Sequence, residues 1–334
     1  STGTVEYVER VKRFNFPEGG SGVLAALLEP VKETKKDAKK DDAVKADSDV
    51  DSKESMESEI DEDQQMTLAG VGSATKKKEP GTELLVWDLA NKQKTSIQDV
   101  ADMSWNKPGT MLAYSISLKD LPKDTTKDVA KEPSKDQSQE IAKTENNTTN
   151  EKAKSTTQVE GVYIWSSESK SSKAILTGAG SYKYLRFDDA GQQFAVLSNR
   201  DELAKKAKDP QVYSLFYWRA DAPQAKLLVN AESNGMTKAW APSEHADLNF
   251  SKDGQRLFLS TAEVAIAPAK NAPEAVKVDL WHWKDPELQS MQKANAERDK
   301  QRSYRAVVHL ADGKFVQLAN KLIPQVMIND NAQF

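Results

Sequence analysis

Alternating apolar and polar residues mark short strands that occur in pairs and recur along the chain. In each copy an aromatic residue precedes a short turn with glycine, and an alternating apolar segment follows. Glycine tolerates positive φ, and Asp or Pro before it presets the turn, so each copy predicts a β-hairpin. Four copies cover 14–28, 103–115, 185–198 and 248–260, and a weaker fifth begins at 326–331.

A second strand pair is predicted after each hairpin, and its first strand carries tryptophan. These pairs lie at 83–97, 161–177 and 212–229, and in the fourth copy at 276–283 with its continuation displaced to 304–318. Two hairpins make a four-stranded antiparallel unit, and about 40 to 45 residues is the size of a β-propeller blade. The anchors of the successive units are Phe16, Trp105, Phe187, Phe250 and Ile328.

The repeats predict an all-β fold, a partial β-propeller over residues 1–334 with about four and a half four-stranded antiparallel blades. Most aromatic residues then pack between blades. The pattern Trp281-His282-Trp283 is the exception that stands out, because strand alternation would turn both tryptophans to one face and His282 to the other.

Two long segments interrupt this pattern. Residues 31–80 and 119–159 contain no aromatic residue and consist mainly of Lys, Asp, Glu, Ser, Thr and Asn. Such segments bury too little apolar area to offset chain entropy, so both are predicted to be disordered insertions between the second and third strands of a blade. They account for an overall hydrophobic content of only 38% beside 29% charged residues.

One helical insertion is predicted at 285–303. Asp285 would be its N-cap and Pro286 its first helical residue, and good helix formers follow. Its large apolar side chains are Leu288 and Met291, so we expect a mostly exposed surface helix.

Candidate chemistry is sparse. The chain has no cysteine and three histidines, His245, His282 and His309, without the spacing of a metal site. The acidic run at 47–51 lacks the later Gly and Glu of a calcium-binding loop. We therefore predict no catalytic, cofactor-binding or metal residue in this chain. The net charge of −4 argues against nucleic acid as a partner, and no apolar run approaches the roughly 20 residues of a membrane-spanning helix.

The hairpins are similar to the blade motif of WD40-like, Tol-type propellers, and 250–254 is the best copy. The stretch 278–289, with its continuation through 309–318, resembles the N-terminal propeller of bacterial serine peptidases of the prolyl oligopeptidase family. That resemblance implies a seven- or eight-bladed propeller that caps an α/β-hydrolase domain and restricts the active site to short peptides. It also implies that a Ser-Asp-His triad in the hydrolase domain performs catalysis.

This chain departs from that pattern. It has no G-x-S-x-G nucleophile elbow, since Gly19-Gly20-Ser21-Gly22 has the wrong spacing, and it has too few blades. We expect the gating propeller of a longer peptidase, whose partners would be a hydrolase domain of the same polypeptide and peptide substrates. The alternative is a stand-alone propeller that scaffolds protein partners in the cell envelope. Such relatives are often exported, so a periplasmic or secreted location is expected, and otherwise a cytoplasmic one.

Overall fold

The computed structural model describes residues 7–30, 80–118, 159–204, 212–264 and 282–329. Residues 1–29 and 79–334 form one compact unit, to which almost all described residues belong. The predicted disordered insertions, 31–80 and 119–159, lie outside the described residues except at Pro80 and Val159.

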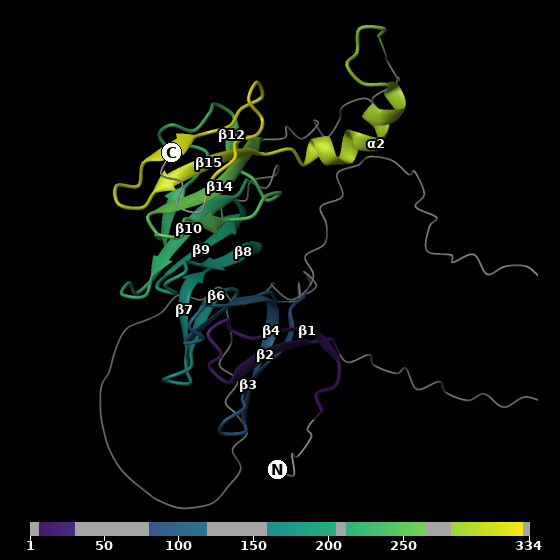
Figure 1. Ribbon diagram of the computed structural model, residues 1–334. Coiled ribbons are helices and arrows are strands. Elements are labelled where there is room, and N and C mark those ends of the chain that lie inside the picture. Colours follow the sequence, from purple (N-terminus) through teal and green to yellow (C-terminus); the bar gives the residue numbers. More distant parts are fainter. Residues whose placement is uncertain (1–6, 31–79, 119–158, 205–211, 265–281, 330–334) are drawn as a thin grey trace, which may run out of the picture. The chain divides into compact units, whose positions relative to one another are not determined.

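The described chain consists of four antiparallel four-stranded units, blades 1 to 4, which follow one another from purple to yellow in Figure 1. This confirms the predicted blades. A seven-stranded sheet holds blades 1 and 2, because their strands run in the order β1 to β7 without a break. Its strands are β1 (Val11–Asn15), β2 (Val23–Leu28), β3 (Thr82–Asp88), β4 (Gln93–Trp105), β5 (Met111–Ile116), β6 (Gly161–Ser166) and β7 (Ser172–Thr177).

Strand β4 belongs to both blades, which the sequence did not predict. Its first part pairs with β3 as the fourth strand of blade 1, and its second part pairs with β5 as the first strand of blade 2. Asp99, with φ of 60°, lies where one pairing gives way to the other, and its carbonyl accepts a hydrogen bond from Ser117 N at 2.9 Å. The chain bends there without leaving the sheet, so 93–97 and 103–105 form one strand of 13 residues.

Blade 3 and blade 4 form separate sheets. In blade 4 the first strand is divided into two short pieces, and both pieces pair with β14. Blade 3 contains β8 (Tyr182–Phe187), β9 (Gln193–Ser198), β10 (Ser214–Arg219) and β11 (Lys226–Val229), and blade 4 contains β12 (Trp240–Pro242), β13 (Asn249–Phe250), β14 (Arg256–Glu263), β15 (Tyr304–His309) and β16 (Phe315–Gln317).

The hydrophobic core lies between successive blades. Along β5, Leu112 and Tyr114 pack in the cluster shared with blade 1, whereas Ala113 packs in the cluster shared with blade 3. In β9, Phe194 belongs to the blade 2 side and Leu197 to the blade 4 side. Strand alternation thus buries both faces of the second strands, which explains their nearly continuous apolar sequences.

Hydrogen bonds also link the hairpin turns of neighbouring blades. The side chain of Asn106 is fully buried. Its Oδ1 accepts a hydrogen bond from Thr110 N within its own turn, and its Nδ2 donates one to Gly191 O in the turn of the next blade. These links between blades are Gly19 N to Lys107 O at 2.8 Å, Asn106 Nδ2 to Gly191 O at 3.2 Å, and Gln193 Nε2 to Gly254 O at 2.9 Å. The turn glycines therefore allow close approach between blades as well as the turn itself.

Three predictions need correction in the C-terminal part. The third strand of blade 4 is β15, because β14 pairs with it from Arg256 opposite His309 to Thr261 opposite Tyr304. Residues 276–281 lie outside the described residues, and 282–284 form a turn rather than a strand. The described residues after β16, up to Asn329, contain no strand, so the half blade expected around Ile328 does not form there.

The predicted surface helix is present as α2 (Gln289–Lys300), but it begins three residues after Pro286, its expected first helical residue. Asp285 is not its N-cap, because its Oδ2 accepts a hydrogen bond from His282 N at 2.8 Å and closes the preceding turn. Leu288 precedes the helix in an extended conformation and makes no side-chain cap. A short helix that was not predicted, α1 (Arg200–Ala204), follows β9.

Candidate functional site

The first strands of the blades lose their register at comparable places. In blade 4, the six residues 243–248 separate β12 from β13. A bulge re-aims side chains relative to the sheet and is common beside functional sites. In blades 1, 2 and 3 the shifts fall between Val11 and Arg13, between Val100 and Asp102, and between Lys183 and Arg186.

Charged side chains at these irregular places pair between blades. Arg13 of β1 donates a hydrogen bond from Nη2 to Asp102 Oδ1 of β4 at 2.5 Å, and the same nitrogen contacts Met103 O at 3.3 Å. Asp102 Oδ1 also accepts a hydrogen bond from Met103 N at 2.9 Å. This arrangement fixes the carboxylate between its own backbone and the guanidinium of blade 1.

A matching pair joins blades 3 and 4. Arg186 of β8 donates from Nε to Asp247 Oδ1 at 3.0 Å and from Nη2 to Asp247 Oδ2 at 2.5 Å. This hydrogen-bonded contact with Asp247 raises the pKa of Arg186 above its usual value. The planar guanidinium matches the two carboxylate oxygens, which makes the contact directional.

A second contact between blades 3 and 4 involves Lys183 and Glu244. Burial is the largest single influence on Lys183 and acts to lower its pKa, but the hydrogen bond and charge attraction of Glu244, together with nearby tyrosines, raise that pKa overall. Burial likewise acts to raise the pKa of Glu244, and Lys183 lowers it overall. Tyr184, at φ of 57°, donates a hydrogen bond to Glu244 O at 2.6 Å. We call Arg13, Asp102, Lys183, Arg186, Glu244 and Asp247 the charged wall.

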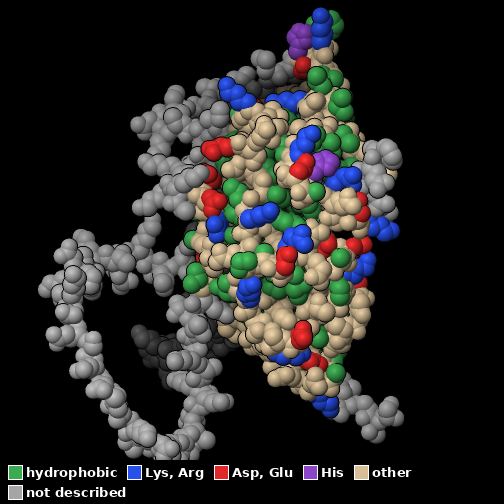
Figure 2. Space-filling model, turned by 90° about the vertical axis from the view of Figure 1, so that its left-hand side faces the viewer, with side chains coloured by type: hydrophobic (Ala, Val, Ile, Leu, Met, Phe, Trp, Pro, Cys, Tyr) green, Lys and Arg blue, Asp and Glu red, His purple; other side chains and the backbone are tan. Residues whose placement is uncertain are grey.

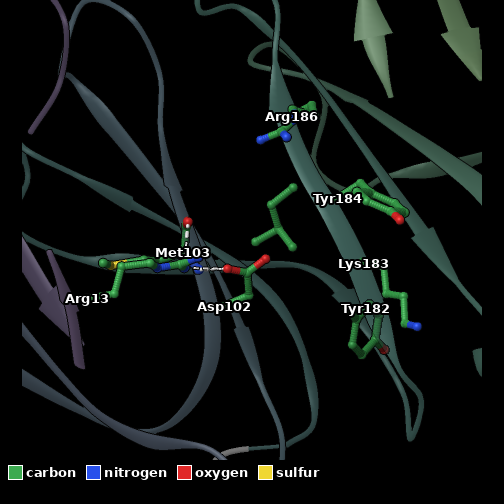
Figure 3. A pocket seen from close by; sticks show the side chains of 8 residues that line it. Arg13, Asp102, Met103, Tyr182, Lys183, Tyr184 and Arg186 are labelled. Atoms are coloured by element: carbon green, nitrogen blue, oxygen red, sulfur yellow. Dashed lines mark hydrogen bonds and ion pairs between the residues drawn. The ribbon is translucent and has the colours of Figure 1, made fainter. Parts of the chain in front are cut away.

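A pocket of about 330 Å³ opens on this wall. Its lining consists of Arg13 of β1, Asp102 and Met103 of β4, and residues 182–186 of β8. Figure 3 shows Asp102 beside the guanidinium group of Arg13, with Arg186 farther away on β8, while Lys183 and Tyr184 point away from the pair. Three lining residues are therefore cationic and one is anionic. The acids that balance Lys183 and Arg186 belong to blade 4 and do not line the pocket.

No catalytic or ligand residues were predicted, so the charged wall is a finding of the structure. Its pairs join residues 89 and 61 positions apart, which no local motif reveals. One signal was available: Arg13, Asp102 and Asp247 each stand three residues before the anchors Phe16, Trp105 and Phe250. A charged residue at a repeated position in several blades indicates a shared environment.

The histidines occupy three different settings. His245 is exposed between β12 and β13, His282 lies in the turn before α2, and His309 ends β15. Trp283 beside His282 is 83% exposed and packs in no core cluster of the described residues. Within the ranges that the structure describes, no group of three acidic or imidazole side chains is arranged to hold a metal ion.

Cationic and anionic side chains are intermixed over the face shown in Figure 2. That face therefore lacks the continuous basic surface that nucleic-acid binding requires. Among the described segments, no helix has both the length and the apolar character needed to cross a bilayer.

No model of a protein family matches the sequence, and no curated protein matches it. Among solved structures, the propeller domain of the Trilobed protease from Pyrococcus furiosus is 9% identical, with 92% of this chain and 57% of that chain aligned and a TM-score of 0.37. Acylaminoacyl peptidase from Pyrococcus horikoshii is 8% identical over 95% of this chain and 34% of that chain, with a TM-score of 0.37.

TolB from Acinetobacter baumannii is 11% identical over 75% of this chain and 41% of that chain, with a TM-score of 0.32. The structural neighbours are thus propellers of prolyl oligopeptidase-family and related peptidases, together with TolB, all at low identity. The chain spans 57%, 34% and 41% of these three neighbours, less than two thirds of each. The blade topology described above identifies the fold.

Proposed function

We propose that the chain is the substrate-restricting propeller of a serine peptidase, and that its charged wall faces the path by which peptides reach a separate catalytic domain. In a propeller the blades surround a central channel. First strands that carry paired charges and line a pocket could form the surface that a polar peptide contacts. The catalytic serine, histidine and aspartate would lie in a hydrolase domain of the same polypeptide.

One observation carries this proposal. All four first strands are irregular in the same region, and they bring Arg13, Asp102, Arg186 and Asp247 to one wall. A purely structural blade edge has no need for four charged groups beside a pocket. Bulges re-aim side chains and are over-represented both at sheet edges and next to active sites.

The scaffold alternative is favoured by a different feature. The five residues of β1 are all exposed, and Phe14 and Phe16 make an edge-to-face pair at 6.0 Å while remaining 61% and 51% exposed. Exposed aromatic residues on an edge strand can serve protein contacts. This alternative requires no hydrolase domain and no reactive serine.

Labelling of the full gene product with a fluorophosphonate probe distinguishes the two functions. The gating proposal expects one labelled serine, which maps outside residues 1–334. Heat denaturation of the protein before the probe is added should abolish this labelling. A full gene product that folds but carries no labelled serine would support the scaffold instead and refute the peptidase proposal.

A further inference from the structure

We propose that the pocket of the charged wall binds the carboxylate group of a short peptide. The inference deepens the proposed function, on which its biological role rests, but the binding itself is a property of this chain. The lining residues carry three cationic groups, Arg13, Lys183 and Arg186, against the single carboxylate of Asp102. Lys183 points away from the pocket centre in Figure 3 and pairs with Glu244, so an anionic group that enters the pocket meets the guanidinium groups of Arg13 and Arg186.

The two arginines have donors to spare. Within the described part of the chain, the hydrogen bonds of Arg13 use only Nη2, and those of Arg186 use Nε and Nη2. A guanidinium group has five N–H donors in a rigid fork and can hold one carboxylate on each side. Asp102 and Asp247 thus orient these side chains and leave further N–H groups for a ligand.

Partial exposure suits this role. The side chains of Arg13 and Arg186 are 50% and 45% exposed, so a ligand can reach them without unfolding of the wall. The pocket, at about 330 Å³, is at the small end of the roughly 300–1,000 Å³ that small-ligand sites occupy. A site of this size fits the end of a peptide or one acidic side chain rather than a folded protein surface.

Asp102 gives the proposal a distinctive consequence. It is the one acidic residue that lines the pocket, and it lies beside the guanidinium group of Arg13 in Figure 3. Its charge opposes an incoming carboxylate while it also orients Arg13. Neutralising Asp102 should therefore strengthen binding, whereas a residue with a merely structural role would have no such effect.

The test is calorimetric titration of the 334-residue chain with three capped peptides. Acetyl-Ala-Ala carries a terminal carboxylate, acetyl-Ala-Glu-amide carries a side-chain carboxylate, and acetyl-Ala-Ala-amide carries neither. We expect binding of at least one carboxylate probe, at least about tenfold tighter than the neutral peptide and weakened by added salt. Preference between the two carboxylate probes identifies the chain end or the acidic side chain as the source.

Variants locate the site. Arg186→Gln should weaken carboxylate binding and Asp102→Asn should strengthen it, each by about three- to fivefold for a partly exposed charge. Arg219→Gln is the matched control, because Arg219 pairs with exposed Asp221 and does not line the pocket. Thermal melting of each variant establishes that it is folded.

Equal binding of the neutral peptide, no binding of either carboxylate probe, or weaker binding by Asp102→Asn would overturn the proposal. Fluorophosphonate labelling of the full gene product is independent of these titrations. A labelled serine with no carboxylate binding would refute only this inference, whereas carboxylate binding without a labelled serine would refute only the peptidase function.

Discussion

Arg186 and Asp247 share two hydrogen bonds, at 3.0 and 2.5 Å, that join β8 of blade 3 to the segment between β12 and β13 in blade 4. Their side chains are 45% and 41% exposed, so solvent weakens the charge attraction. The contact is nevertheless bidentate, which fixes its geometry. Among the ion pairs of the charged wall, this is the one whose coupling free energy can be measured most directly.

A double-mutant cycle with Arg186→Met and Asp247→Asn should give a coupling free energy of about 0.5–1 kcal/mol in urea unfolding. The control cycle uses Arg219 and Asp221, whose single 3.3 Å contact joins side chains that are 63% and 72% exposed. That pair should couple by less than about 0.3 kcal/mol. Equal coupling energies in the two cycles would mean that the wall contact has no special geometry.

The contact between hairpin turns of blades 2 and 3 can be tested at a glycine. At Gly191, with φ of 70°, a Cβ atom would lie 2.8 Å from both Asn106 Nδ2 and Pro108 Cδ. Gly191→Ala should therefore cost about 2–4 kcal/mol, since the steric clash adds to the backbone strain. The measurement is the change in unfolding free energy.

Gly313→Ala is the matched control for that substitution. Gly313 has φ of 72°, but a Cβ there would have no atom within 4 Å. It should cost only the backbone term of about 1–2 kcal/mol. If both substitutions destabilise the protein equally, the turns of adjacent blades do not approach as closely as described.

Asp88 should make stability depend on pH. A hydrogen bond from Lys170 Nζ at 2.7 Å, followed by those from Asn91, holds the pKa of Asp88 far below its ordinary value of 3.8. Because the folded-state pKa is depressed, this stabilisation is present above the ordinary pKa and is lost as pH falls below it. The melting temperature should consequently fall between about pH 5 and pH 2.

Lys170→Gln should flatten that pH profile, because it removes the largest cause of the low pKa. Lys173→Gln is the control, since Lys173 Nζ donates to the uncharged Ala222 O at 3.3 Å. Its pH profile should match that of the unsubstituted chain. An unchanged slope in Lys170→Gln would show that the pair with Asp88 does not contribute to the acid sensitivity.

Local signals were sufficient to predict strands that follow a glycine turn. The structure confirms the predicted second strands of blades 1 and 3 as β2 (Val23–Leu28) and β9 (Gln193–Ser198), because a glycine turn precedes each strand and an apolar segment follows that turn. The sharing of β4 by two blades was not predicted. The chain bends at Asp99, and the sequence of β4 contains no glycine or proline that would indicate this bend. Trp283 was expected in a strand, but the pairing of β14 with β15 leaves it exposed.

The charged wall could not be predicted from the sequence by local rules. Each of its residues resembles an ordinary exposed charge, and only the packing of successive blades brings Arg13 to Asp102 or Lys183 to Glu244. The repeated position before the aromatic anchor would have placed three of the six residues. The choice of partners depends on the bulges, which arise from tertiary pairing rather than from residue type.

The gating function is tested most directly by size discrimination in the full gene product. Its kcat/KM is measured for a short fluorogenic peptide and for the same sequence tethered at both ends to folded domains. We predict rapid cleavage of the free peptide, at least about hundredfold slower cleavage of the tethered one, and loss of this difference when residues 1–334 are removed from a catalytic domain that stays folded. Equal cleavage of the two substrates by the intact protein would contradict the account.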